Sequence, residues 1–396
     1  MEASSEAPRL PVRTNTRDRI RKYIGQYGLI AVLLIMPVAF GLNDLATDGN
    51  LTRLGNNLVA GLSNGAIWAL IALLLVMPVV YGFQDISNDG SLARLGNNVV
   101  DGLSNGAIWA LVALGYTLVY GIIELINFAH GEVFMLGSLV SAGLFGTIGL
   151  TAATGVGGLV VGLLLILVLA MLASGSLNVM IERVAYRPLR SAPKLAPLIT
   201  AVGFSFILQN VGILWIGGSP EGIPDLINAQ KELVNISGVS ISQGDVLAVA
   251  ATIPLVFMLT TFISQSRLGK AMRATAQDPE AARLMGINVD TTISATFLLG
   301  GLMAGAAGLI YALYQTTIWY LQGFQAGLIA FTAAVMGGIG NLWGAVLGGF
   351  IIGIIQQISD NRIGGEWTPA IVFAYLVLIM VFRPQGLLGE ETREAG

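Results

Sequence analysis

The sequence contains no cysteine and a single histidine, His130. Disulfides, thiolate metal sites and cysteine nucleophiles are therefore excluded, and so is a metal site built from several histidines. Charged residues make up 11% of the 396 residues, whereas soluble domains carry about 25%. The charges are also clustered: 49 residues between Glu132 and Glu182, and 69 between Asp290 and Asp360, include no Asp, Glu, Lys, Arg or His.

These uncharged stretches are long enough to cross a membrane several times. A bilayer core about 30 Å thick requires roughly 20 apolar residues per helix. The composition predicts an all-α, polytopic transmembrane helical bundle of about 9–11 spans, some of them broken or re-entrant. The candidate spans are 23–42, 58–83, 99–121, 124–148, 156–181, 196–217, 244–264, 291–313, 320–338, 341–358 and 367–382.

The polar segments between the spans differ in charge. Residues 182–194 and 265–290 are rich in Lys and Arg, whereas 218–243 holds one lysine against three acidic residues. Because excess Lys and Arg marks the cytoplasmic side, we expect the first two segments inside and the third outside. Residues 1–22 carry six basic residues and are predicted to form a cytoplasmic basic tail.

A tandem repeat occupies the N-terminal third. Residues 30–70 match 71–111 with 28 of 41 positions identical. The sequence therefore divides into a tail (1–22), an N-terminal extension with the duplication (23–98), a transmembrane core (99–389) and a C-terminal tail (390–396). The end of the first repeat copy and the start of the second join into one additional apolar stretch, residues 58–83. If every candidate crosses once, the basic tail is placed outside, in conflict with its charge.

The first candidate site lies in residues 115–137, an apolar segment with several polar side chains. Ionisable residues inside a membrane are costly and mark transport paths, and a helix break exposes backbone groups to a ligand. We interpret this segment as a turn lining the translocation path; the alternative is a loop at the membrane surface, with its side chains merely solvated or paired. The candidate residues are Glu124, Asn127, His130, Gly131 and Glu132.

The second candidate site lies in residues 331–349, where glycines interrupt more than thirty apolar residues. This pattern favours a broken or re-entrant helix pair that presents backbone termini to a ligand; the alternative is an ordinary tight turn between two spans. The candidate residues are Gly337, Gly338, Gly340 and Asn341.

The third segment, 267–288, is expected on the cytoplasmic side. Asp278 is a favourable N-cap, Pro279 suits the first helical position, and Gly286 is typical of a helix end. The spacing predicts a short amphipathic helix over 278–288 that fits a groove on a cytoplasmic partner; a plain loop helix is the alternative. The chain has no nucleotide-binding motif, so we expect no ATP hydrolysis by this chain and no catalytic residues.

The phrases GYTLVYGIIELINFAHGE (115–132), RATAQDPEAARLMGI (273–287) and FRPQGLLG (382–389) resemble permeases of branched-chain amino acid ABC importers, of the LivH type. The resemblance extends over about 99–389. It implies coupling to partner ATPases through residues that match the family's coupling motif: Asp278, Glu280, Ala281, Ala282, Arg283 and Gly286.

The same resemblance implies an assembly in a bacterial cytoplasmic (inner) membrane. The expected partners are a second homologous permease, two cytoplasmic ABC ATPases, a periplasmic or lipid-anchored substrate-binding protein, and lipid. ATP and Mg are expected on the ATPases, and no metal, cofactor or nucleic acid on this chain. Urea or short-amide importers remain an alternative substrate class. An ion-coupled carrier using Glu124, His130 and Glu132 is a rival of another class, although it has no need of a helix at 278–288.

Overall fold

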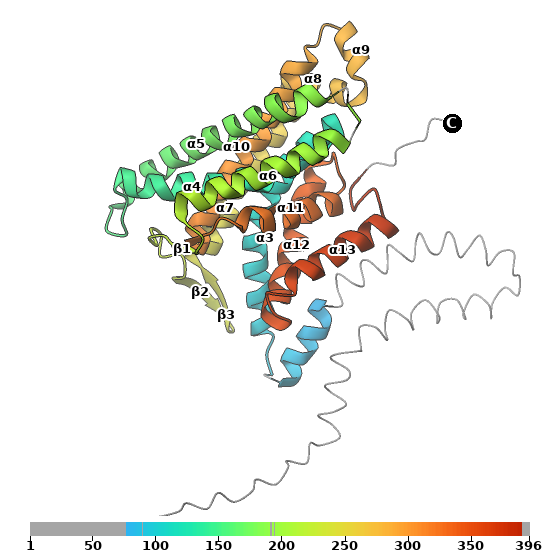
Figure 1. The fold of residues 1–396 in the computed structure, drawn as a ribbon. Helices are drawn as coiled ribbons and strands as arrows, with labels where there is room; N and C mark the ends of the chain where they lie inside the picture. The colour runs from blue at the N-terminus through green and yellow to red at the C-terminus, as the bar shows by residue number, and fades with distance from the viewer. Residues whose placement is uncertain (1–76, 89, 191, 194, 390–396) are drawn as a thin grey trace, which may run out of the picture. The chain divides into compact units, whose positions relative to one another are not determined.

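The computed structural model describes residues 77–88, 90–190, 192–193 and 195–389. The predicted tail 1–22, the first repeat copy 30–70, the candidate span 23–42, most of 58–83, and the C-terminal tail 390–396 lie outside the described residues. Helices dominate the described part (Figure 1). They are α3 (Ala93–Ile123), α4 (His130–Ile148), α5 (Val156–Ile181), α6 (Leu195–Ile216), α7 (Gln243–Gln265), α8 (Arg267–Gln277), α9 (Pro279–Leu284), α10 (Val289–Gln315), α11 (Gln322–Gly337), α12 (Leu342–Arg362) and α13 (Thr368–Phe382).

Seven of these helices, α3, α4, α5, α6, α7, α10 and α12, are long and apolar enough to cross a membrane. The candidates 320–338 and 367–382 became α11 and α13, of 16 and 15 residues. At 1.5 Å per residue α11 is about 24 Å long, shorter than a bilayer core of about 30 Å. The all-α, polytopic architecture is confirmed, and broken segments are part of it.

The remaining elements are small. A π-helical turn (Glu182–Tyr186) and a 3-10 turn (Arg187–Leu189) extend α5. β2 (Glu232–Ile236) pairs antiparallel with β3 (Val239–Ser242), and β1 (Glu221–Gly222) pairs with β4 (Thr317–Ile318). β2 and β3 lie at the opposite end of the bundle from α8 and α9 (Figure 1), in agreement with the charge difference between the two sets of loops.

Helix ends follow the local sequence. Ser242 and Asp245 form a capping box at the start of α7, with Ser242 accepting from the Asp245 N–H at 3.2 Å. Asn288 caps α10 and Asn341 caps α12 in the same way. Polar residues in an otherwise apolar chain therefore set where the spans begin.

Glycines bring the central helices into backbone contact. A Cβ added to Gly102 or Gly106 of α3 would lie 2.6 or 2.8 Å from a Cα of α12. At the crossing of α10 with α5, a Cβ on Gly301 would lie 2.7 Å from the Gly175 Cα. Small residues allow such approach in lipid, where close packing drives helix association. As a result α3, α4 and α10 form the buried centre, and α5, α6 and α7 expose most of their apolar side chains.

Alternating crossings from the basic loop at 182–194 place Ala93, the start of α3, at the outer end of the bundle. Two contacts agree with this placement. Asn97 donates to the Gly238 carbonyl in the acidic segment at 3.2 Å. Arg362, at the end of α12, pairs with Asp85 in the helical residues 77–88 at 2.6 Å. The basic tail, residues 1–22, lies outside the described residues, so its predicted position on the cytoplasmic side stays a prediction.

Candidate functional site

The chain breaks its helical path between α3 and α4. The prediction of one span over 124–148 is wrong at its start, because helix begins only at His130. Glu124 ends α3 in the left-handed conformation, with φ of 51°, and residues 124–127 have no regular structure. The break therefore lies before Gly131, which belongs to the first turn of α4.

Asn127 anchors this break to two other helices. Its Nδ2 donates to Asn178 Oδ1 at 3.0 Å, and Asn178 Nδ2 donates to the Phe297 carbonyl at 2.6 Å. The Tyr186 hydroxyl donates to the Ile126 carbonyl at 3.0 Å. Asn127, Asn178, Tyr186 and Phe297 are fully or almost fully buried. This network joins the break to α5, its π-helical extension and α10.

His130 and Glu132 are buried as well, so they are not solvated, and Glu132 is paired with other side chains. The His130 ring packs edge-on against Tyr116 at 4.8 Å and lies against Gly115 of α3. Glu132 Oε1 accepts hydrogen bonds from Ser205 Oγ at 2.7 Å and Gln209 Nε2 at 2.8 Å. Both partners are on α6, more than seventy residues away in the sequence.

Gly131 and Gly323 form part of a seam between α4 and α11. A Cβ on Gly131 would collide with the Gly323 carbonyl and lie 2.7 Å from the Gly327 Cα. The seam between α4 and α11 is thus backbone against backbone at these three glycines.

The predicted site at 337–341 is a tight turn between α11 and α12. Gly338 and Gly340 have positive φ, of 108° and 91°, which glycine adopts at little cost. Residues after α13 cover this turn: Leu388 N–H donates to the Gly337 carbonyl at 2.9 Å, and Asn341 Nδ2 donates to the Leu388 carbonyl at 2.7 Å. The turn lies close to the end of α3, because a Cβ on Gly121 would lie 3.3 Å from the Gly340 Cα.

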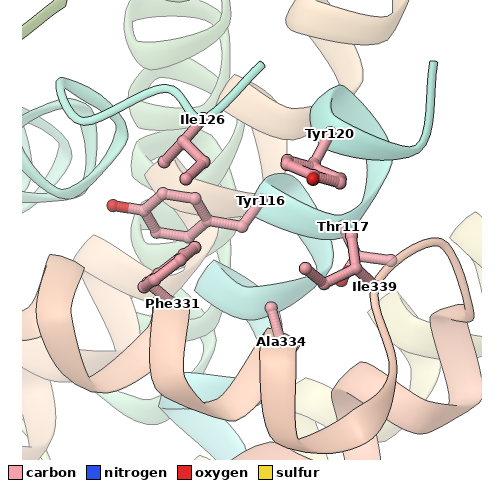
Figure 2. Close-up of a pocket in the computed structure, with 7 residues that line it drawn as sticks. All are labelled: Tyr116, Thr117, Tyr120, Ile126, Phe331, Ala334 and Ile339. Atoms are coloured by element: carbon pink, nitrogen blue, oxygen red, sulfur yellow. The ribbon is translucent and has the colours of Figure 1, made fainter. Parts of the chain in front are cut away.

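A small pocket lies between these two predicted sites. Figure 2 shows side chains of α3 and α11 facing one another, closed by one residue from the break and one from the glycine turn. Its free volume is about 10 Å³, close to the minimum for a single water. No amino acid fits in this pocket. The lining residues are Tyr116, Thr117, Tyr120, Ile126, Phe331, Ala334 and Ile339.

The predicted cytoplasmic helix is α9, and it follows a second helix, α8, which the sequence interpretation missed. Asp278 caps α9 by accepting from the Glu280 and Ala281 N–H groups at 2.8 and 3.0 Å. Gly286, with φ of +83°, donates to the Arg283 carbonyl while Ile287 donates to the Ala282 carbonyl. These two bonds form a Schellman motif. The predicted cap and stop of this helix are both confirmed.

Leu284 and Met285, which sequence analysis did not select, are the most exposed apolar residues of this end of the bundle, at 88% and 83%. Large exposed apolar side chains at a water-facing end mark a protein contact. A helix of six residues holds them at a defined position, because both of its ends are hydrogen-bonded.

A charged cluster connects the start of α10, just after α9, to the extension of α5. Glu182 is fully buried; it pairs with Arg190 and accepts from Ser294 Oγ at 2.6 Å. Arg190 also contacts Asp290 at 2.6 Å, and Arg187 contacts Asp290 at 2.8 Å. We call Glu182, Arg187, Arg190, Asp290 and Ser294 the cytoplasmic clamp. These side chains therefore link the start of α10, which follows α9, to the extension of α5.

Sequence analysis missed Asn178, Ser205 and Gln209. Asn178 and Gln209 are polar residues inside apolar spans, and that alone is a signal of function or pairing. Their partners lie on other segments, however: Asn178 binds Asn127 of the break and Phe297 of α10, and Gln209 binds Glu132 of α4. Only the tertiary structure therefore reveals what they bind.

The fold and site define a multi-pass helical membrane protein with a break between its helices α3 and α4 and an exposed pair of short helices, α8 and α9. Residues 98–381 match the family described as "Branched-chain amino acid transport system / permease component". The chain belongs to this family of permease components.

Curated relatives agree. The chain is 41% identical to the high-affinity branched-chain amino acid transport system permease protein BraD of Pseudomonas aeruginosa, over 70% of this chain and 90% of that protein. It is also 41% identical to the corresponding permease LivH of Escherichia coli, over 70% and 89%. A probable branched-chain amino acid permease of Methanocaldococcus jannaschii is 26% identical, over 71% and 88%. No solved structure matches the chain.

Proposed function

We propose that this chain is the membrane-spanning subunit of an ATP-driven importer of branched-chain or related neutral amino acids. The observation that carries the proposal is the conjunction of a family match over 98–381 with an exposed, doubly capped helix α9 at the cytoplasmic end. The names of the relatives favour the amino acid branch over urea or short amides. A carrier that works alone has no use for a protruding apolar helix end.

The proposed assembly pairs this chain with a second permease in a bacterial cytoplasmic membrane. Two ATPases bind the α9 segments and hold ATP and Mg, and a binding protein delivers substrate from outside. Asp278, Glu280, Ala281, Ala282, Arg283 and Gly286 form the coupling segment, to which the structure adds Leu284 and Met285. Closure of the ATPases then moves α9, and the clamp passes this movement to α5 and the break at 124–129.

The residues proposed for the translocation path are Glu124, Asn127, His130, Gly131 and Glu132 on the break and α4. Gly337, Gly338, Gly340 and Asn341 are proposed to form its cytoplasmic closure, because the turn they form is covered by residues 385–389. Opening this end requires the covering segment to move.

The experiment is uptake of labelled leucine, alanine and urea in a strain carrying the full operon, with and without this chain. We expect leucine uptake to depend on the chain and to require ATP, and urea uptake to be unaffected by its loss. Leucine uptake driven by this chain alone, without ATPase subunits, contradicts the proposal and supports the ion-coupled carrier.

A further inference from the structure

Two helices of the bundle begin in its interior, beside one another. α4 begins at His130 and α11 at Gln322, and neither has a side-chain N-cap. Glu132 binds Ser205, ten residues into α6, which corresponds to a depth of about 15 Å. Because a bilayer core is about 30 Å thick, this contact lies near the middle of the membrane.

The N-terminal turn of α11 has backbone N–H groups that are not used in hydrogen bonds to the described residues. Gln322 N–H donates to the Trp319 carbonyl and Gln325 N–H to the Leu321 carbonyl. The N–H groups of Gly323 and Phe324, between them, have no acceptor among the described residues. Every helix start carries such orphan donors and a partial positive charge, and here no acidic residue of α11 lies in the first turn to meet them.

Glu132 is aimed at this turn. Its Oε1 is occupied by Ser205 and Gln209, whereas Oε2 is buried and has no hydrogen-bond partner. Oε2 is also the nearest atom that a Cβ on Gly323 would strike. The free carboxylate oxygen therefore occupies the space that the absence of a side chain at Gly323 leaves open.

A carboxylate facing a helix N-terminus is the electrostatic complement of a zwitterion. An ammonium group satisfies the free carboxylate oxygen, and a carboxylate accepts from the N–H groups of the helix start. In a low-dielectric interior both contacts are stronger than in water. Glu132 and the start of α11 thus present one group for each end of an α-amino acid.

The contact between α4 and α11 is where we expect the helices to separate and an apolar side chain to enter. Gly131, Gly323 and Gly327 bring α4 and α11 into backbone contact. Beside them Gln322 of α11 donates to Ser138 Oγ of α4, so separation of the two helices breaks this side-chain hydrogen bond. The Cβ of Met135, which is fully buried, lies 2.9 Å from the position of a Cβ on Gly323, and its Sδ and Cε lie 3.2 Å from the position of a Cβ on Gly212 of α6. Methionine is flexible and polarizable, and it adapts to branched aliphatic surfaces.

We propose that a zwitterionic α-amino acid binds between Glu132 and the N-terminal turn of α11 during transport. Its ammonium group pairs with the free oxygen of Glu132, and its carboxylate accepts from the Gly323 and Phe324 N–H groups. In the state seen here Glu132 lies directly against α11, and the site is closed. This assignment rests on the proposed function and names the substrate-binding groups within it.

The first test uses the whole importer in proteoliposomes with saturating binding protein. Glu132→Gln keeps an acceptor for Ser205 and Gln209 but presents an amide to the ammonium group. We expect the maximal rate of labelled leucine uptake to fall about tenfold or more, from loss of a charged hydrogen bond. The control is Thr200→Ala on α6, whose hydroxyl bonds only its own helix at 2.9 Å. Wild-type uptake by Glu132→Gln overturns the proposal, whereas a wild-type importer that moves no leucine contradicts the proposed function.

A second test remains decisive if Glu132→Gln fails to assemble. Since the chain has no cysteine, Ser205→Cys provides a single thiol at the site. We expect a methanethiosulfonate reagent to label it during ATP turnover, and leucine to slow the labelling. We expect 3-methylbutylamine and 4-methylpentanoate, which each lack one charged group, to protect less than leucine. Equal protection by 4-methylpentanoate, no protection by leucine, or no labelling in any state each overturns the proposal.

Discussion

At the scale of single residues, the buried amides distinguish this protein from a plain apolar bundle. Asn178 lies at the end of α5 and holds both the Asn127 side chain and the Phe297 carbonyl. A buried polar group that loses its partner costs about 1–3 kcal/mol. One side chain therefore stabilises the shape of the break against two helices.

Replacing Asn178 with Ala is expected to lower the thermal stability of the detergent-solubilised complex and to reduce leucine uptake. The physical reason is that Asn127 Nδ2 then has no acceptor in a dry interior. The matched control is Asn210→Ala, because Asn210 is exposed and bonds only the Phe206 carbonyl of its own helix at 2.8 Å. Thermal unfolding followed by size-exclusion chromatography checks this. An equal loss of stability in the two variants contradicts the role given to Asn178.

At the scale of elements, α9 and its neighbours form the segment that we propose couples docking of the ATPases to movement of the bundle. α9 is short, but its capping bonds and the Schellman motif define its ends. Its connection to α10 passes through Gly286, whose conformation no L side chain adopts without strain. The clamp then ties the start of α10 to the extension of α5.

Gly286→Ala is expected to uncouple uptake from ATP hydrolysis while membrane insertion stays normal. The positive φ costs an alanine roughly 1–2 kcal/mol, and no atom lies within 4 Å of the added methyl group, so the cost comes from the backbone alone. Gly203→Ala in α6 serves as control, because its surroundings are equally open and its φ is ordinary. The ratio of leucine transported to ATP hydrolysed is the measurement. An unchanged ratio in Gly286→Ala would remove the support for coupling through this turn.

In the clamp, Glu182→Gln is expected to destabilise the protein far more than Asp290→Asn. Breaking a buried pair costs roughly 3–5 kcal/mol, and we expect the low end because Arg190 is partly exposed. Asp290 is 42% exposed, and exposed pairs are worth about 0–1 kcal/mol.

Thermal unfolding of the two variants measures this difference. The double variant Glu182→Met with Arg190→Met, which removes both charges, is expected to recover most of the stability. If the double variant is no more stable than Glu182→Gln, the loss comes from packing and the charge argument fails.

At the scale of the whole molecule, the two ends of the bundle have different tasks. The outer end carries the short sheets and the acidic segment, and the inner end carries the basic loops and α9. Leu284 and Met285 are the most exposed apolar residues of the inner end in the described part of the chain, at 88% and 83%.

Replacing both Leu284 and Met285 with Ser is expected to reduce recovery of the ATPases when the tagged chain is purified in mild detergent. The apolar contact then loses most of the area it buries against the partner. Ile363→Ser, at the outer end and 42% exposed, is the control. Full recovery of both ATPases with the double variant would place the docking surface elsewhere.

Deletion of residues 30–70 is expected to leave leucine uptake largely unchanged. The second copy forms the described start of α3, and its Asp101 is the nearest acceptor for Gln357 of α12, at 3.4 Å. The first copy has Ala60 at the matching position. Uptake and membrane abundance are measured together. A complete loss of uptake at normal abundance would show that the first copy is required.

Much of the architecture was predictable because lipid imposes simple requirements. Charge-free runs of 49 and 69 residues leave a helical membrane bundle as the explanation, and the Lys and Arg distribution orients it. Asp278, Pro279 and Gly286 predict the start and end of α9, because helix capping depends on neighbours only three or four residues away. The start of α4 was mispredicted because residues 124–129 are as apolar as a helix, and tertiary bonds through Asn127 decide their shape.

The sequence by itself determined the class and the short helix α9, and it predicted the orientation of the loops, since hydropathy, charge and caps are local properties. It also identified Glu132 as a costly residue in an apolar segment. Only the tertiary structure decided which oxygen of Glu132 is satisfied and what the other one faces. Ser205, Gln209 and Gly323 reach it from 73 to 191 positions away. Contacts between helices in lipid depend on small residues and close packing, and no local pattern encodes which helices those residues bring together.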